Sequence, residues 1–137
     1  MSAEEKKLDM EGVAQDAAEA ERVAEEARQE QETGSYTHTF KNPFPWKGKT
    51  YETLTFDWTA LNGGDHLEIE SEIVMKGRTL VSPAFTGDFL AGMAARACTE
   101  RDEKGKRVID GWAIKEMTLT DFQAITRKAR GFLLRAE

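Results

Sequence analysis

The sequence predicts an α+β protein, in which an N-terminal β-hairpin packs on about three α-helices and an acidic helical or disordered tail precedes them. Three observations predict this class. Residues 1–33 are acidic and low in complexity, residues 36–58 alternate apolar and polar side chains, and residues 118–134 repeat apolar side chains at helical spacing. The 137 residues are enough for one modest folded domain. We therefore expect a tail over residues 1–34 and an α+β domain over residues 35–137.

The net negative charge of the chain lies in the tail. Residues 1–33 have a net charge of −7 and the whole chain has −6, so the remaining residues sum to +1. A helix here would bury only a thin apolar stripe (Leu8, Val13 and Val23 with several alanines), so we expect it to be solvated or disordered, with a partner-binding helix as the alternative. An acidic tail on a neutral body argues against nucleic-acid binding and against anionic membrane surfaces. No apolar run approaches the roughly 20 residues that span a bilayer.

Two strands follow the tail. Residues 36–40 and 50–58 alternate apolar or aromatic side chains with threonine and other polar residues, which is the strand period. The turn between them is expected at residues 47–49, Lys-Gly-Lys, where glycine supplies the unusual backbone angle. Pro43 and Pro45 cannot donate to a sheet ladder, so the first strand should be an edge strand or bulged there. A lone hairpin cannot bury its apolar face, so it needs the helices.

The stretch Gly48-Lys49-Thr50 also matches the end of a phosphate-binding loop. The full motif needs a second glycine five residues before Gly48, where this chain has Pro43, which lacks an N–H. Thr50 also begins a strand, whereas the motif leads into a helix. A hairpin turn is the better interpretation, and nucleotide binding through the turn is a third function class that thermal shift with ATP or GTP would test.

Residues 65–76 form the first predicted helix of the body. They follow the breaker Gly63-Gly64, and Asp65 as N-cap with Glu68 three residues later has the spacing of a capping box. Gly77 ends the segment. The same residues partly alternate, so a strand stays open as the alternative.

The second helix is predicted over residues 82–97, with Ser82 as N-cap and Pro83 at the first helical position. Its apolar face comprises Phe85, Phe89, Leu90, Met93, Ala94 and Ala97. The charged stretch from Thr99 to Asp110 predicts an exposed loop, and a short turn is expected around Trp112.

The last helix has the clearest pattern. Thr118 is a good N-cap with Asp121 three residues later, and Met117 and Phe122 have the spacing of a hydrophobic staple. Its apolar face comprises Leu119, Phe122, Ile125, Ala129, Phe132 and Leu133.

The sequence offers no catalytic pattern. His38 and His66 stand alone in different elements, and no His or Cys cluster has the spacing of metal ligands. Cys98 lies in an apolar helical stretch, which is typical of a buried core thiol. We therefore expect no enzyme activity, no cofactor and no metal site.

Three stretches together resemble the tail assembly chaperones of tailed bacteriophages. They are the hairpin "FKNPFPWKGKTYETLTF", the middle helical pair with Asp65 starting one member, and the ending "MTLTDFQAITRKARGFLL". The resemblance runs from about Tyr36 to Leu134. The acidic stretch before it is longer, and the loop from Thr99 to Asp110 larger, than is usual in that family.

The resemblance implies a non-enzymatic role in virion morphogenesis. Such chaperones bind the tape measure protein in the host cytoplasm and keep it soluble while the tail tube assembles, and they are absent from the mature virion. It implies further candidate partners: the tail tube protein, a longer form of the same chain made by frameshifting, and other copies of the chain. The alternative function is a structural tail or neck component retained in the virion.

The last helix supplies the candidate partner-binding residues. A protein that covers apolar helices reversibly needs a few apolar anchors inside a polar rim. The expected anchors are Leu119, Phe122, Ile125, Phe132 and Leu133.

Overall fold

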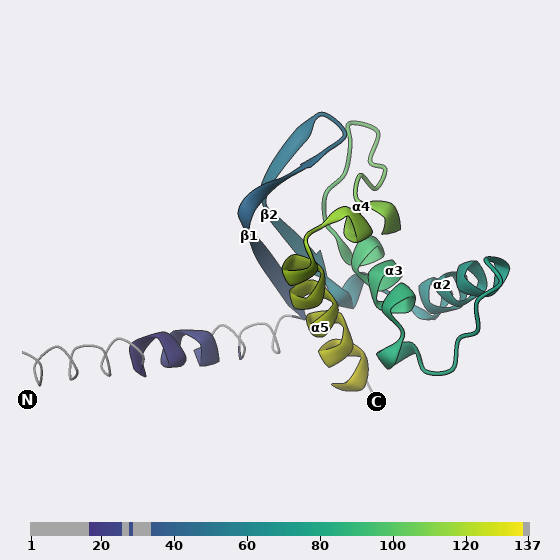
Figure 1. The fold of residues 1–137 in the computed structure, drawn as a ribbon, viewed down its shortest axis with the longest axis horizontal. Helices are drawn as coiled ribbons and strands as arrows, with labels where there is room; N and C mark the ends of the chain where they lie inside the picture. The colour runs from purple at the N-terminus through teal and green to yellow at the C-terminus, as the bar shows by residue number, and fades with distance from the viewer. Residues whose placement is uncertain (1–16, 26–27, 29–33, 136–137) are drawn as a thin grey trace, which may run out of the picture. The chain divides into compact units, whose positions relative to one another are not determined.

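The computed structural model describes residues 17–25, 28 and 34–135 (Figure 1). Its contacts divide the chain into two units, Met1–Thr33 and Gly34–Glu137. In the first unit, residues 17–25 are helical and exposed to solvent. The rest of residues 1–33 lies outside the described residues, apart from residue 28, which is also helical and exposed, and Gly34 belongs to the second unit.

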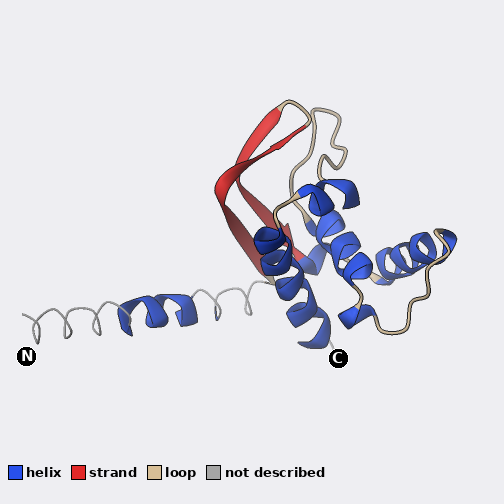
Figure 2. Cartoon of the chain, viewed as in Figure 1, coloured by secondary structure: helices blue, strands red, loops and turns tan. Residues whose placement is uncertain are grey.

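The second unit begins with the predicted hairpin. Strands β1 (Ser35–Trp46) and β2 (Lys49–Asp57) pair antiparallel (Figure 2). The register shifts between Thr39 and Phe44, so β1 is irregular in the stretch that contains Pro43, as the sequence predicted. At the turn, Lys47 and Gly48 both have positive φ, 47° and 80°. Lysine rarely has a positive φ. Two consecutive residues with positive φ are typical of the two-residue turn that joins the strands of a β-hairpin.

Four α-helices complete the described part of the second unit: α2 (Gly63–Met75), α3 (Gly87–Ala97), α4 (Gly111–Glu116) and α5 (Leu119–Arg135). Short 3₁₀ turns occupy Trp58–Ala60 (η1) and Pro83–Phe85 (η2). Helix α3 is central, because it contacts α2, α4, α5 and β2 (Figure 1). The α+β class is confirmed, and the stretch expected as a turn around Trp112 is the short helix α4.

Helix α2 settles the alternative left open for residues 65–76 in favour of a helix. The predicted N-cap was wrong. The cap is Asn62, whose side chain accepts a hydrogen bond from the Asp65 N–H at 3.0 Å while the Asp65 carboxylate accepts from the Asn62 N–H at 2.9 Å. The two glycines therefore belong to the first turn of the helix, and Asp65 is the third residue of the capping box.

The second predicted helix is also corrected, because it is broken in two. Ser82 and Pro83 open η2, and α3 starts only at Gly87. Phe85 is therefore 70% exposed and does not join the core face of α3. It is covered in part by Arg130, whose guanidinium lies 5.5 Å from the ring centroid and whose Nε donates to the Ala84 carbonyl at 2.8 Å.

The core lies between the hairpin and α3. Its largest fully buried side chains are Phe56, Phe89, Leu54, Ile69, Leu90, Ile109, Ile114, Ile125 and Cys98. Helices α2 and α3 approach closely at Gly92, where an added Cβ would lie 2.8 Å from Cγ2 of Ile69. The absence of a side chain at Gly92 therefore fixes how near these two helices pack.

Candidate partner-binding groove

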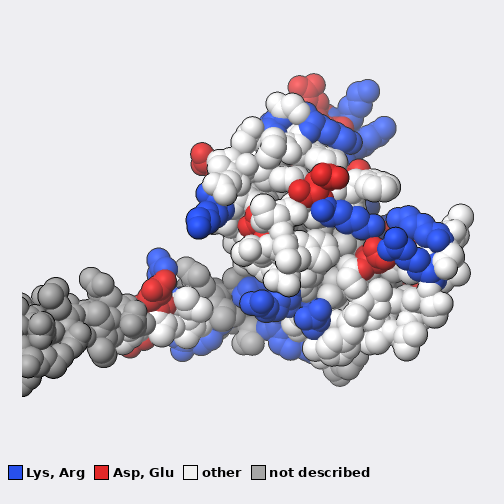
Figure 3. Space-filling model, viewed as in Figure 1, with Lys and Arg blue, Asp and Glu red and all other residues white. Residues whose placement is uncertain are grey.

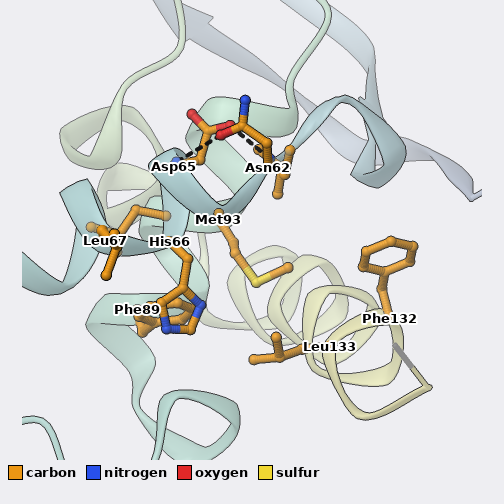
Figure 4. A pocket seen from close by; sticks show the side chains of 11 residues that line it. Asn62, Asp65, His66, Leu67, Phe89, Met93, Phe132 and Leu133 are labelled. Carbon is orange, nitrogen blue, oxygen red and sulfur yellow. Dashed lines mark hydrogen bonds between the residues drawn. The ribbon is translucent and has the colours of Figure 1, made fainter. Parts of the chain in front are cut away.

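An apolar groove of about 540 Å³ lies between the first half of α2, the helix α3 and the last turns of α5 (Figure 4). We call it the α2/α3/α5 groove. Three elements distant in sequence form it, so it exists only in the folded domain. Its apolar lining comprises Leu61, Leu67, Ile69, Phe89, Met93, Phe132 and Leu133.

The floor and the walls of the groove differ in burial. Ile69, Phe89 and Met93 form the floor and are almost fully buried within the core. Leu67 on one wall is 63% exposed, and Phe132 and Leu133 on the other are half-buried. The walls therefore offer apolar surface that a partner can still cover, whereas the side chains of the floor are already buried by the protein's own core.

His66 lies along one side of the floor. Figure 4 shows its imidazole ring beside Phe89, and the two ring centroids are 4.7 Å apart at an interplanar angle of 60°. The Nε2 atom lies 3.8 Å from a carboxylate oxygen of Glu70, one helical turn further along α2. A histidine with one face on a phenylalanine adds a polar edge to an otherwise apolar wall.

The polar rim is set by the N-terminal cap of α2. The hydrogen bond from the Asn62 backbone lowers the pKa of the Asp65 carboxyl below its usual range; burial opposes this shift, and Arg96 reinforces it. Figure 4 shows Asn62 and Asp65 bonded to each other at the edge of the groove. The rim therefore keeps a fixed negative charge at neutral pH.

Arg96 of α3 forms ion pairs with the acidic residues of this rim. Its guanidinium lies 2.9 Å from Asp65, 2.7 Å from Glu68 and 3.3 Å from Glu72, so one cation bridges α3 to two turns of α2. Burial alone would lower the pKa of Arg96, but the bonds from Glu68 and Asp65 outweigh it and raise the pKa. Together with the close approach at Gly92, this network holds the distance between α2 and α3, and hence one side of the groove.

The structure separates the five predicted anchors. Phe132 and Leu133 line the groove. Phe122 is half-buried against the core, and Ile125 is fully buried, so Ile125 cannot reach a partner while the fold is intact. Leu119 is 69% exposed but lies 13 residues before Phe132, about 20 Å along the helix at 1.5 Å per residue.

Leu67 is an exposed apolar groove residue that the sequence did not suggest. The buried residues of α2 are Ile69 and Ile73, four positions apart, and Leu67 lies off that stripe. An exposed leucine beside a buried stripe is common, so no local pattern marks it as functional. Its place on the groove wall becomes visible only because α5, remote in sequence, ends opposite it.

Three further observations from the described ranges concern metal binding, membrane crossing and the thiol of Cys98. These ranges contain no cluster of three or more His, Cys, Asp or Glu that could hold a metal ion, and no helix long and apolar enough to cross a bilayer. Cys98 is buried, and burial raises the pKa of its thiol, which disfavours the thiolate that a nucleophile requires. In comparisons of the chain with protein-family models, curated proteins and solved structures, no match was found.

Proposed function

We propose that this protein is a bacteriophage tail assembly chaperone that binds the tape measure protein and keeps it soluble during tail tube assembly. The α2/α3/α5 groove is the observation that carries the proposal. It presents Leu67, Phe132 and Leu133 above an apolar floor, with the Asn62–Asp65 cap at its edge. A long, largely helical chain that is prone to aggregate exposes apolar stripes of the kind such a groove can cover.

The size of the groove suits reversible binding. Fully covering a Leu- or Phe-sized side chain contributes about 1.5–3 kcal/mol, so three half-covered wall residues and their partners contribute several kcal/mol in total. Association itself costs at least about 4 kcal/mol in lost freedom. The balance leaves at most a few kcal/mol, which corresponds to an affinity in the millimolar range or weaker for this groove alone and lets a chaperone be displaced as tube subunits arrive.

Two measurements test the proposal. Tagged protein isolated from infected cells in which tails assemble should recover the tape measure protein, as identified by mass spectrometry. Purified virions should lack the chain. Recovery of no tape measure protein contradicts the chaperone role. Stoichiometric presence in virions would instead support the alternative, a structural tail or neck component.

A further inference from the structure

A second hollow lies at the other end of the hairpin, and two turns of identical sequence line it. One is Lys47-Gly48-Lys49, between β1 and β2, and the other is Lys104-Gly105-Lys106, in the loop after α3. Gly48 and Gly105 both have the left-handed backbone, with φ of 80° and 78°. We call the space of about 640 Å³ that they line the KGK hollow.

The second turn is held by hydrogen bonds that use the backbone N–H groups of its lysines and not their ammonium groups. Arg101 and Arg107 form an antiparallel bridge, and one carboxylate oxygen of Asp102 accepts from the N–H groups of Lys104 and Lys106 at 2.8 and 2.9 Å. This loop is therefore a small closed hairpin with a defined tip.

The hairpin and the loop are tied together beside the hollow. The indole Nε1 of Trp46, at the end of β1, donates to the Val108 carbonyl at 3.2 Å. This bond joins a residue just before the first turn to one just after the second, and the lysines of both turns line the same hollow. Figure 3 shows Lys and Arg side chains gathered at this end of the second unit, beside a few acidic ones.

The lining of the KGK hollow is strongly basic. Its cations are Lys47, Lys49, Arg101, Lys104, Lys106 and Arg107, against the acids Asp102 and Glu103. The net charge of +1 outside residues 1–33 hides this concentration. Like charges gathered at one hollow repel one another, so an anion bound among them relieves that repulsion.

The arginines are engaged, but the four lysines form no ion pair with any described residue. Arg101 donates to the carbonyls of Cys98 and Glu100 at 2.7 and 2.9 Å, and Arg107 lies 3.9 Å from Asp65. Lys47 and Lys49 instead lie 5.9 Å from the ring centroids of Trp46 and Tyr51. The ammonium groups of the four lysines are therefore the cations of the KGK hollow that have no ion-pair partner among the described residues.

Tyr51 adds an unused hydrogen-bond donor. It lines the hollow, only 7% of its surface is exposed, and its buried hydroxyl has no hydrogen-bond partner in the described part of the chain. Burial, followed by the negative charge of Glu100, raises the pKa of this phenol, so it keeps its proton. Buried hydroxyl groups without a partner are rare in folded proteins, so this hydroxyl marks an unsatisfied polar group in a residue that lines the hollow.

We propose that the KGK hollow binds an oligophosphate, either free polyphosphate or the phosphodiester backbone of a nucleic acid. Consecutive phosphates carry several charges on one short backbone. An acidic peptide must order a separate long side chain for each charge, which costs conformational entropy each time. The ammonium groups of Lys47 and Lys49 lie over the rings of Trp46 and Tyr51, so these rings offer no open face on which a base could stack. We therefore expect the site to bind phosphate groups without distinguishing one base from another.

The test is titration calorimetry on the full chain, at about 50 mM and 200 mM salt. The probes are tripolyphosphate, a single-stranded oligonucleotide of about 12 nucleotides and poly-glutamate. We expect a phosphate probe to bind and to weaken with salt, and the double variant Lys104→Ala/Lys106→Ala to bind it at least about tenfold more weakly, since each lost charge contact costs about 1 kcal/mol or more. The control is Lys41→Ala/Lys76→Ala, which removes two exposed lysines outside the hollow.

Each outcome of the titrations either supports the proposal or overturns it. Tighter binding of the oligonucleotide identifies the phosphodiester backbone as the source, and binding of tripolyphosphate alone identifies free polyphosphate. Tighter binding of poly-glutamate, no binding of either phosphate probe at low salt, or an equal loss in the control variant would overturn the proposal. All four replaced lysines are exposed, so both variants should keep the melting temperature of the parent protein.

Discussion

Nε2 of His38 lies 2.7 Å from Oδ1 of Asp121, which bonds the first strand of the hairpin to the first turn of α5 across 83 residues of sequence. Both side chains are largely buried, at 7% and 13% exposure. A carboxylate can only accept, so Nε2 carries the proton, and Nδ1 faces the Tyr36 hydroxyl at 2.7 Å. The other Asp121 oxygen accepts from the Thr118 hydroxyl at 2.7 Å, so one carboxylate both holds the capping hydroxyl of α5 and joins this helix to β1.

This double role predicts a large effect of removing the carboxylate. Asp121→Ala should lower the free energy of unfolding by about 3 kcal/mol, because it loses a charge-assisted hydrogen bond and part of a helix cap together. Asp121→Asn keeps an acceptor of the same shape and should cost about 1 kcal/mol. Urea unfolding measures both, and equal losses in the two variants would contradict the expectation that the neutral acceptor in Asp121→Asn keeps most of these hydrogen bonds.

Gly92 gives a prediction about how α2 packs on α3. Gly92→Ala should destabilise the protein by about 1 kcal/mol, because the clash with Ile69 exceeds the gain in helix propensity. Gly131→Ala is the matched control, since a Cβ there meets only the end of the Arg135 side chain, 4.0 Å away. That variant should stabilise α5 by about 0.5–1 kcal/mol. Stabilisation by Gly92→Ala of the size expected for Gly131→Ala would refute the close approach.

The pH dependence follows from two aspartates with lowered pKa. For Asp65 the hydrogen bond from Asn62 is the main cause; for Asp88 burial acts in the opposite direction but bonds from Arg78 and Lys115 outweigh it. Each carboxylate therefore stabilises the fold above the unfolded pKa of about 3.9, and this contribution disappears as pH falls through the lower folded pKa. Asp65→Asn should flatten the decline in stability below about pH 4, as measured by urea unfolding at a series of pH values. An unchanged acid limb would contradict the stated role of Asp65.

Cys98 should report on the integrity of the core. Its side chain is 1% exposed and its thiol pKa is raised by burial, so a thiol reagent such as Ellman's should react about 100-fold or more slowly with native than with urea-unfolded protein. Native reaction at the rate of an exposed cysteine would show that the segment around the end of α3 is open.

The sequence predicted the elements whose signals are local. Strand alternation, the Lys-Gly-Lys turn and the Thr118 cap each depend on neighbours within a few residues, and the structure contains all three. The N-cap of α2 was misassigned because Asp65, with Glu68 three residues later, also has the spacing of a capping box. The actual N-cap is Asn62, which exchanges two hydrogen bonds with Asp65.

The candidate site was less predictable, because it depends on tertiary contacts. The apolar face of α5 was interpreted as one surface, but neighbouring elements bury Ile125 and leave Phe132 at a groove edge. The partners in the His38–Asp121 bond, and the two Lys-Gly-Lys turns, lie far apart in sequence and follow no spacing rule.

Affinity of two matched leucine variants for the tape measure protein tests the groove most directly. Leu67 and Leu119 are similarly exposed, but only Leu67 lines the groove. Leu67→Gln should weaken binding at least about tenfold, the equivalent of losing roughly 1.4 kcal/mol of apolar burial, while Leu119→Gln should change it less than about twofold. Both variants should unfold at the parent urea concentration. Loss of binding in Leu119→Gln with Leu67→Gln unaffected would contradict binding in the α2/α3/α5 groove.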